Sequence, residues 1–142
     1  MKSGKKPTVP NDYVVDAHAL IWFAADDPQL GARAGDVMRN PASKLFLPSI
    51  ALAEACWVVG KARTKISSAA ELIRAVEADP RFVVVPLTVE LIKLTLNMPA
   101  ELEMDDRQIV ATVKLLAAQG NPPALLTKDE KIVRSALVPI VW

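Results

Sequence analysis

The stretch YVVDAHALIW, residues 13–22, contains the pattern that decides the fold. Its first three residues are an apolar run rich in β-branched side chains, which predicts a buried strand. The apolar residues from Ala17 onward predict a helix that follows at once. Asp16 lies between the two, at the carboxyl end of the predicted strand. Ligands bind at that edge of open α/β sheets, and an aspartate there can equally be the N-cap of the helix.

The same order of strand and helix recurs along the chain. Strands are predicted at 13–15, 45–47, 82–85, 125–127 and 139–141, and helices at 17–25, 30–40, 49–61, 67–78, 89–97, 106–119 and 129–135. This alternation indicates an α/β protein with a parallel sheet covered by helices on both faces. Ser67 is the expected N-cap of one helix, and capping boxes are expected at Asp105 with Gln108 and at Thr127 with Glu130.

Length and composition describe one globular domain. The chain has 142 residues, of which 51% are hydrophobic and 23% charged, which is typical of a packed protein. We expect a flexible basic N-terminal tail over residues 1–12 and a single domain over residues 13–142. No apolar run approaches the roughly 20 residues that span a bilayer. The first residues have no secretory signal, so a cytoplasmic protein without membrane contact is expected.

Charge and cysteine content exclude several kinds of site. The net charge is +1, and without three lysines of the tail the rest of the chain has 14 basic and 16 acidic residues. Direct DNA binding through bulk positive charge is therefore not expected. Cys56 is the only cysteine and His18 the only histidine, which excludes an intrachain disulfide and a structural zinc site. Any metal would be held by oxygen atoms.

Acidic residues follow or interrupt the apolar elements at separate points of the chain. Glu54 is the only charged residue between Lys44 and Lys61, in a helix that is apolar nearly all round and is expected to be buried. Asp106 and Asp129 stand at predicted helix starts, where a purely structural role is also common. A parallel sheet would bring these residues and Asp16 into one cleft. Carboxylates gathered there would repel one another unless a hard cation such as Mg²⁺ or Mn²⁺ binds among them.

With these motifs the chain resembles PIN-domain proteins, and among them the VapC-type ribonuclease toxins of type II toxin–antitoxin systems. The matching segments are VVDAHALIW at 14–22, PSIALAE at 48–54, DDRQIVAT at 105–112 and LLTKDEKI at 125–132. The resemblance implies a three-layer α/β/α sandwich with a central, mostly parallel five-stranded sheet. It also implies a metal-dependent endoribonuclease acting on single-stranded or structured RNA, a VapB-like antitoxin as partner, and a homodimer.

The resemblance assigns the catalytic and metal-binding positions to four acids, and gives Thr127 the task of orienting a metal-bound water. The four are Asp16, Glu54, Asp106 and Asp129. Two residues depart from the family pattern: Ala17 stands where a hydroxyl residue is common, and Asp105 where histidine is common. Asp105 is therefore either a further metal ligand or a helix cap.

Other residues have both a functional and a structural interpretation. Lys61, Arg63, Lys65 and Arg107 are candidates for RNA phosphate contacts, although the first three also suit a solvated helix end and Arg107 could balance charge. His18 is expected to be packed or hydrogen-bonded. Cys56 and the three tryptophans are interpreted as core, and no stacking platform for bases is evident.

The main alternative function is a catalytically inactive PIN-like module that binds a protein partner or RNA. A phosphatase with an aspartyl nucleophile of the haloacid-dehalogenase type is disfavoured. Such an enzyme needs a second aspartate two residues after the first, and His18 occupies that position.

Overall fold

A computed structural model describes residues 11–61 and 64–142. Within these residues a five-stranded sheet has the order β3-β2-β1-β4-β5, and every neighbouring pair is parallel. The strands are β1 Asp12–Val15, β2 Lys44–Pro48, β3 Phe82–Val85, β4 Ala124–Leu126 and β5 Ile140–Val141. The helices are α1 Ala17–Ala24, α2 Ala32–Arg39, α3 Ser49–Lys61, α4 Ala69–Ala78, α5 Val89–Lys93, α6 Met104–Ala118 and α7 Glu130–Ser135.

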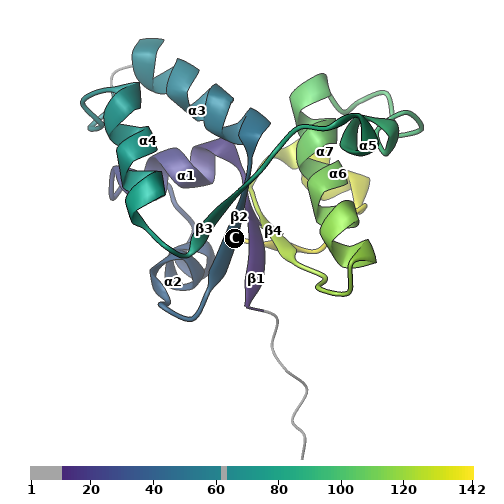
Figure 1. Cartoon of the computed structure of the whole chain (residues 1–142), viewed down its shortest axis with the longest axis horizontal. Helices are drawn as coiled ribbons and strands as arrows, with labels where there is room; N and C mark the ends of the chain where they lie inside the picture. Colours follow the sequence, from purple (N-terminus) through teal and green to yellow (C-terminus); the bar gives the residue numbers. More distant parts are fainter. Residues whose placement is uncertain (1–10, 62–63) are drawn as a thin grey trace, which may run out of the picture.

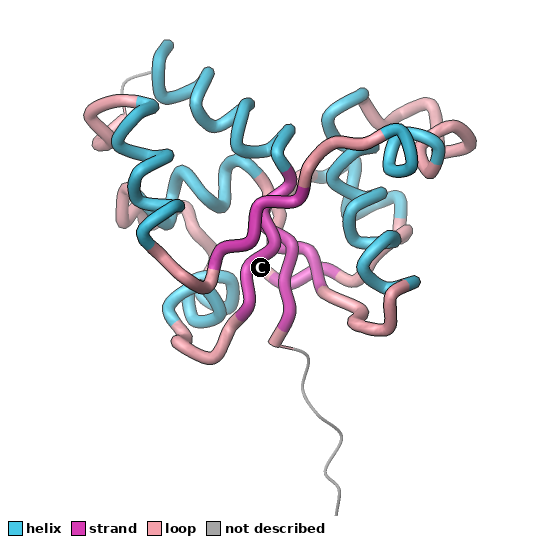
Figure 2. Tube along the Cα trace, in the orientation of Figure 1, coloured by secondary structure: helices cyan, strands magenta, loops and turns pink. Residues whose placement is uncertain are grey.

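Helices cover both faces of this sheet. Helices α1 to α4 lie on one side and α5 to α7 on the other (Figure 1), and the strands run between the two groups (Figure 2). The α/β/α sandwich predicted from the sequence is confirmed, and the sheet is parallel throughout.

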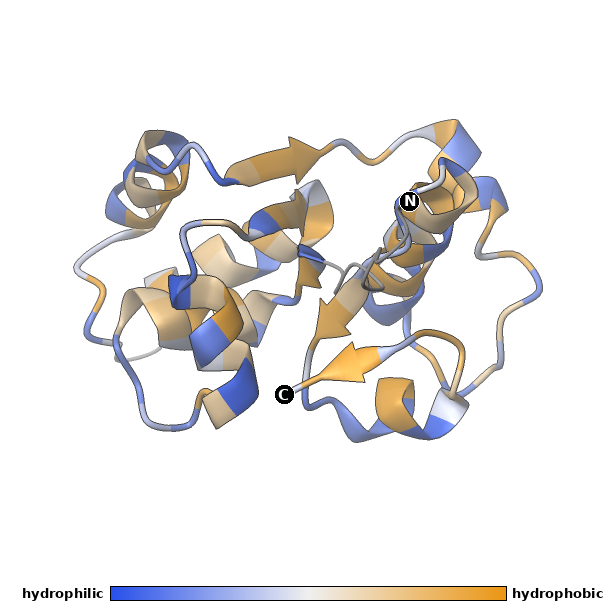
Figure 3. Ribbon diagram, turned by 90° about the horizontal axis from the view of Figure 1, so that it is seen from below, coloured by the Kyte–Doolittle hydropathy of each residue, from blue (hydrophilic) through white to orange (hydrophobic). Residues whose placement is uncertain are grey.

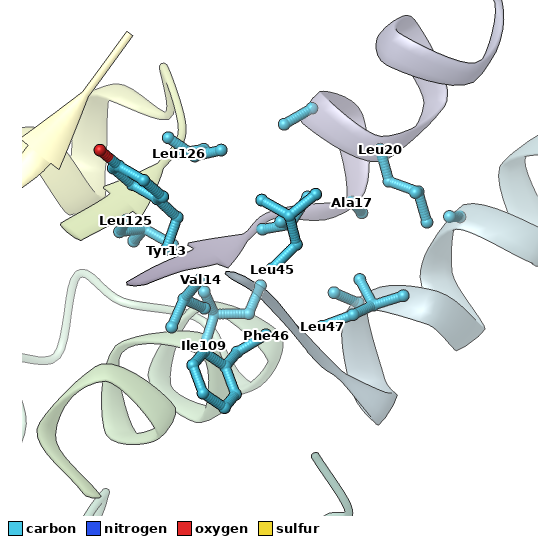
Figure 4. Packing of buried hydrophobic residues seen from close by; sticks show 14 of the residues in the cluster. Tyr13, Val14, Ala17, Leu20, Leu45, Phe46, Leu47, Ile109, Leu125 and Leu126 are labelled. Carbon is cyan, nitrogen blue, oxygen red and sulfur yellow. The ribbon is translucent and has the colours of Figure 1, made fainter. Parts of the chain in front are cut away.

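The strands are the most apolar part of the molecule, as their orange colour in Figure 3 shows. Val14, Leu45, Leu47 and Leu125 are completely inaccessible to solvent, because helices cover the sheet on both faces. Figure 4 shows these side chains packed against Ala17, Leu20 and Ile109 of the covering helices. Full burial of each such side chain contributes roughly 1.5–3 kcal/mol. Among the described residues, no helix has the length and hydropathy needed to cross a membrane.

The chain adds β2 and β3 on one side of β1, and β4 and β5 on the other side. The chain leaves β1 through α1 and α2 to reach β2 on one side, and it returns from β3 through α5 and α6 to reach β4 on the other. The two strands pair in parallel, with Val15 opposite Leu126. Their carboxyl ends therefore meet at the switch point, where connections diverge to opposite faces and leave a crevice for ligands.

Several element boundaries differ from those expected. Strand β1 begins at Asp12. The carbonyl oxygen of Asn11 already accepts a hydrogen bond from Lys44 N of β2 at 2.7 Å. The fold therefore includes the last residues of the expected tail, while residues 1–10 lie outside the described residues. Helix α5 ends at Lys93 rather than at residue 97, because the chain turns from Leu94 onward.

All three predicted caps are wrong. Ser68, not Ser67, is the N-cap of α4, with its hydroxyl accepting from Glu71 N at 3.1 Å. Helix α6 begins at Met104 with Glu103 as N-cap, so Asp105 lies in the first turn. Helix α7 is capped by Asp129 rather than by Thr127. Ser68 and Glu103 have the extended backbone typical of a cap, and Asp129 caps α7 through its carboxylate.

Candidate functional site

A cavity of about 420 Å³ opens at the switch point, above the carboxyl ends of β1 and β4. Its volume lies in the range of ordinary ligand sites. All six residues that the sequence proposed for catalysis, metal binding or their support line this cavity: Asp16, Glu54, Asp105, Asp106, Thr127 and Asp129. Residues separated by more than a hundred positions in the chain therefore come together, as predicted.

Hydrogen bonds hold the acids that follow β1 and β4. The Asp16 backbone N–H donates to Leu126 O at 3.2 Å, which joins the two strand ends. One carboxylate oxygen of Asp16 accepts from Ala17 N at 2.7 Å, and the other accepts from the Thr127 hydroxyl at 2.6 Å. The buried Thr127 Oγ1 also accepts from Asp129 N at 3.1 Å. Thr127 thus connects two acids, a structural task that the sequence did not suggest.

Asp129 has a second structural task. Its Oδ1 accepts from Lys131 N at 2.9 Å and from Ile132 N at 3.1 Å, which caps α7. The sequence left open whether this aspartate is a cap or a site residue. It is a cap, and its carboxylate also lines the cavity.

The other three acids are held by helices. Glu54 lies in the middle of α3, and Asp105 and Asp106 lie in the first turn of α6. Glu54 is only partly buried, because α3 turns one face outward: Trp57, one turn further on, is 62% exposed. The predictions of a buried helix and a core Trp57 are wrong here, while Cys56 does pack against the core.

The electrostatics of the cavity raise the pKa values of three carboxyl groups. Burial, together with hydrogen bonding and charge repulsion from Asp105, raises the pKa of Glu54 to about 8. Burial and the charges of Asp105 and Asp129 raise the pKa of Asp106 to about 6. Burial also raises the pKa of Asp16, against the opposing effect of its bond with Thr127. Burial is the largest cause of all three shifts, and charge repulsion among the acids adds to each of them.

The donor set fits a hard divalent cation. Six carboxylates line the cavity with only two lysines, and oxygen ligands are the ones that Mg²⁺ prefers. Over residues 11–61 and 64–142, no three Asp, Glu, His or Cys side chains already surround one point closely enough to hold an ion. The carboxylates would therefore have to draw together around a cation, which relieves their repulsion.

The cavity also has a wall that the sequence did not predict. It contains His18 and Trp22 of α1 and Trp142 beyond β5. The prediction of a packed His18 is wrong, since this side chain is exposed. Trp22 and Trp142 are half-buried and contact the core on one side. The spacing of His18 and Trp22, four residues apart on one helix, was the only sequence signal of this wall.

Two lysines lie at the cavity, and both already have partners. Lys128 Nζ lies 4.6 Å from the centroid of the Trp22 ring. Lys131 Nζ is paired with Glu103 Oε1 at 3.2 Å, across the rim between α7 and α6. Lys131 and Glu103 have no signature in the sequence, because their side chains come together only through the fold.

Three of the four cations proposed for RNA binding are described, and they lie outside the cavity lining. The Arg107 guanidinium donates to the carbonyl oxygens of Leu102 at 2.8 Å and Pro99 at 3.2 Å, which ties down the loop before α6. Lys61 Nζ lies 4.0 Å from the Trp57 ring centroid at the end of α3. Lys65 is exposed, and Arg63 lies outside the described residues. The cavity lining contains none of the three described cations.

The sequence matches the family model of the PIN domain over residues 13–136. No curated protein matches it significantly.

The fold is similar to that of solved structures with low sequence identity. VapBC2 from Rickettsia felis, bound to a DNA fragment from their promoter, is 14% identical with a TM-score of 0.65, covering 92% of this chain and 97% of that one. FitAB bound to an IR36 DNA fragment is 16% identical with a TM-score of 0.66, covering 91% and 93%. FitAcB from Neisseria gonorrhoeae is 17% identical with a TM-score of 0.65, covering 92% and 96%. At these identities the likeness is one of fold.

Proposed function

Because the chain belongs to the PIN domain family, we propose that it is an endoribonuclease that requires Mg²⁺ or Mn²⁺ and acts as the toxin of a toxin–antitoxin pair. One observation carries the proposal. Carboxylates from four separate segments line a single cavity at the switch point of the sheet, and three of their pKa values are raised. A purely structural set of acids would instead be paired with cations or exposed to solvent.

Each residue has a task in this proposal. Asp16, Glu54, Asp106 and Asp129 would hold the cation, and Asp105 would add negative charge beside them. When bound, Mg²⁺ or Mn²⁺ makes a water more acidic and neutralises charge that develops on the phosphodiester. Thr127 keeps the Asp16 carboxylate oriented through its 2.6 Å hydrogen bond. This bond leaves the hydroxyl to position a carboxylate rather than the water itself.

The negative charge of the cavity would also make RNA binding depend on the metal ion. A phosphodiester entering a cavity with six carboxylates and two lysines is repelled unless cations compensate. Lys128 and Lys131 supply the positive charge nearest to the acids, so we assign them the contacts with RNA phosphates. Arg107 is engaged with backbone carbonyls, and we give it a structural role.

We also propose the two protein partners that the family suggests. A VapB-like antitoxin would bind this chain, as the complexes VapBC2 and FitAB indicate by their names. A second copy would bind through α5 and the start of α6, because Val89 is 68%, Leu96 69% and Met104 63% exposed there. Apolar side chains of this size are usually covered in an assembly. A monomeric mass for the isolated chain in sedimentation would contradict this dimer.

The decisive test compares the wild type with Asp16→Asn on total RNA, with Mn²⁺ present and with a chelator added. We expect discrete cleavage sites that require the metal, and a loss of at least about 1,000-fold in rate for the variant. Asp36→Asn is the matched control, because Asp36 is exposed on α2 and pairs only with Arg39. It should cut like the wild type.

Two results would overturn the proposal. Retained cleavage by pure, folded Asp16→Asn would mean that the cavity is not the active site. Intact RNA with wild type, together with no Mn²⁺ uptake in calorimetry, would favour the inactive PIN-like module.

A further inference from the structure

Part of the cavity lining is built from aromatic rings. Trp22 and His18 have ring centroids 5.3 Å apart, and Trp22 meets Trp142 edge to face at 5.8 Å. The chain has three tryptophans, and two of them line this one cavity. These half-buried rings leave part of their surface in the cavity beside a charged site, where a ligand with a flat apolar face could cover it.

The position of Trp142 depends on a glycine. A Cβ at Gly31, the N-cap of α2, would lie only 2.6 Å from the Trp142 Cδ1. The indole therefore fits directly against the backbone at the start of α2, where any side chain would displace it. This close contact fixes the ring at the cavity, although Trp142 follows the last strand.

A cation of the cavity lining contacts one of these rings. Lys128 stands in the sequence between Thr127 and Asp129, and its ammonium group lies over the Trp22 ring. Lys128 is exposed, so this cation–π contact is weak and easily exchanged for another partner. A phosphate is a stronger partner for the ammonium than the ring, because both are charged.

Together these features suit a nucleotide. We propose that Trp22 and Trp142, with His18 at the rim, form a subsite that stacks the base of a nucleotide next to the scissile phosphate, while Lys128 moves from the ring to the adjoining phosphate. This inference rests on the proposed ribonuclease function. Stacking accepts every base, since each has a π-face. The subsite therefore selects RNA with an unpaired, unstacked base rather than a fixed sequence.

Binding and cleavage of a fluorescein-labelled single-stranded oligoribonucleotide test this subsite. The oligonucleotide spans a mapped cleavage site, or is a ten-nucleotide mixed-sequence strand if none is found. It is compared with a series of strands, each of which has one abasic nucleotide at a different position. Binding is measured by anisotropy with Mn²⁺ in an Asp16→Asn background, so that the RNA stays intact. Trp22→Leu and Trp142→Leu should each weaken binding by roughly 5- to 100-fold. Trp22→Phe should retain most of it.

A purely structural role for Trp22 would not depend on the base. We expect an abasic nucleotide at one position to weaken binding by the Asp16→Asn parent. On that strand, the Trp22→Leu variant should bind as well as the parent. Trp57→Leu is the matched control, because Trp57 is exposed on α3 and lies outside the cavity lining. It should bind every oligonucleotide like its parent. Trp22→Phe also tests the subsite if the leucine variant does not fold.

The outcomes separate this subsite from the proposed function. If the wild type cuts RNA and Trp22→Leu binds and cuts like it, the subsite is wrong and the nuclease stands. If nothing cuts RNA and binding still depends on Trp22 and on one base, the subsite stands without the nuclease. Equal losses on intact and abasic strands, or a Trp22→Leu effect on antitoxin binding alone, would overturn the subsite.

Discussion

The two halves of the acidic cavity are built in different ways. Asp16 and Asp129 follow neighbouring strands, and hydrogen bonds from Ala17, Thr127, Lys131 and Ile132 orient their carboxylates. Glu54 and Asp106 project from two helices, and their surroundings raise their pKa values. We call these the strand half and the helix half. Burial raises the pKa of Asp16 as well, but hydrogen bonds orient the strand half before any ligand arrives. In the helix half, burial and charge repulsion both disfavour the ionised acids, and a cation would relieve the repulsion.

This difference predicts opposite consequences for the same kind of substitution. Neutralising an acid of the helix half removes repulsion, so the fold should gain stability while activity is lost. Removing a side chain of the strand half leaves hydrogen-bonding groups unpaired, so fold and activity should both suffer.

The widest separation between stability and activity is expected in the helix half. Glu54→Gln and Asp106→Asn should each slow metal-dependent RNA cleavage by about 100-fold or more, because each removes a charge placed to hold the cation. Their melting temperatures without metal should equal or exceed that of the wild type at pH 7.5. Glu77→Gln on the exposed face of α4 serves as control and should change neither property. A variant of the helix half that melts well below the wild type would contradict the comparison.

The next effect concerns the residue that joins the two acids of the strand half. Thr127→Val should lower the free energy of unfolding by roughly 1–3 kcal/mol, because it leaves Asp16 Oδ2 and Asp129 N without their partner. Metal affinity or cleavage should fall by about 10- to 100-fold, as is usual for a group that orients a ligand. Urea denaturation and Mn²⁺ titration measure the two quantities.

Two controls define the role of this hydroxyl. Thr127→Ser retains the hydroxyl and should recover most of both properties. Thr112→Val removes a different buried hydroxyl, which bonds to Gln108 O within α6; cleavage should be unaffected. Full Mn²⁺ affinity in Thr127→Val would show that the hydroxyl does not position Asp16.

The strand half was the easier part to predict from sequence. Apolar runs buried on both faces leave few interpretations, so the strands and the acids after them were found correctly. Asp16 and Thr127 meet because parallel strands end at one edge of the sheet, and this follows from topology alone. The helix half was harder to predict from sequence. The apolar composition of α3 does not reveal which face packs inward, so Glu54 was assigned to the cavity correctly while Trp57 was wrongly assigned to the core.

Contacts that depend on the conformation of loops were out of reach of sequence reasoning. Arg107 looked like a phosphate ligand because nothing in the sequence shows that the carbonyl oxygens of Pro99 and Leu102 surround it. Several acids precede α6, and the sequence cannot tell which one has the extended backbone of a cap. Trp142 reaches the cavity only because β5 lies beside β4 and Gly31 leaves room for the indole.

A third prediction uses pH to separate the halves. The pKa of Glu54 rises from 4.5 to about 8 on folding, so the folded protein binds this proton more tightly than the unfolded chain. The stabilising contribution is fully present below pH 4.5 and is lost as the pH rises through 8. Glu54→Gln should therefore melt near the wild type at pH 4.5 and on the order of a few degrees above it at pH 8.5.

Metal should reverse this ranking. Mn²⁺ at pH 7.5 should raise the melting temperature of the wild type more than that of Glu54→Gln, because the cation replaces the proton in relieving repulsion. Calorimetric melting across pH 4.5 to 8.5 measures both effects. A constant difference between the two proteins over this range would mean that Glu54 is not strained in the folded state.

The smallest change in stability separates charge from hydrogen bonding at one position of the strand half. Asp129 accepts from two backbone N–H groups of α7 through Oδ1 and also lines the cavity. Asp129→Asn keeps the accepting oxygen, so stability should stay within about 0.5 kcal/mol while cleavage is lost with the charge. Asp129→Ala removes the cap as well and should cost about 1 kcal/mol in the free energy of unfolding. Equal stability of the two variants in urea would mean that the cap contributes nothing, and the strand half would then be held by the hydrogen bonds of Asp16 with Ala17, Leu126 and Thr127.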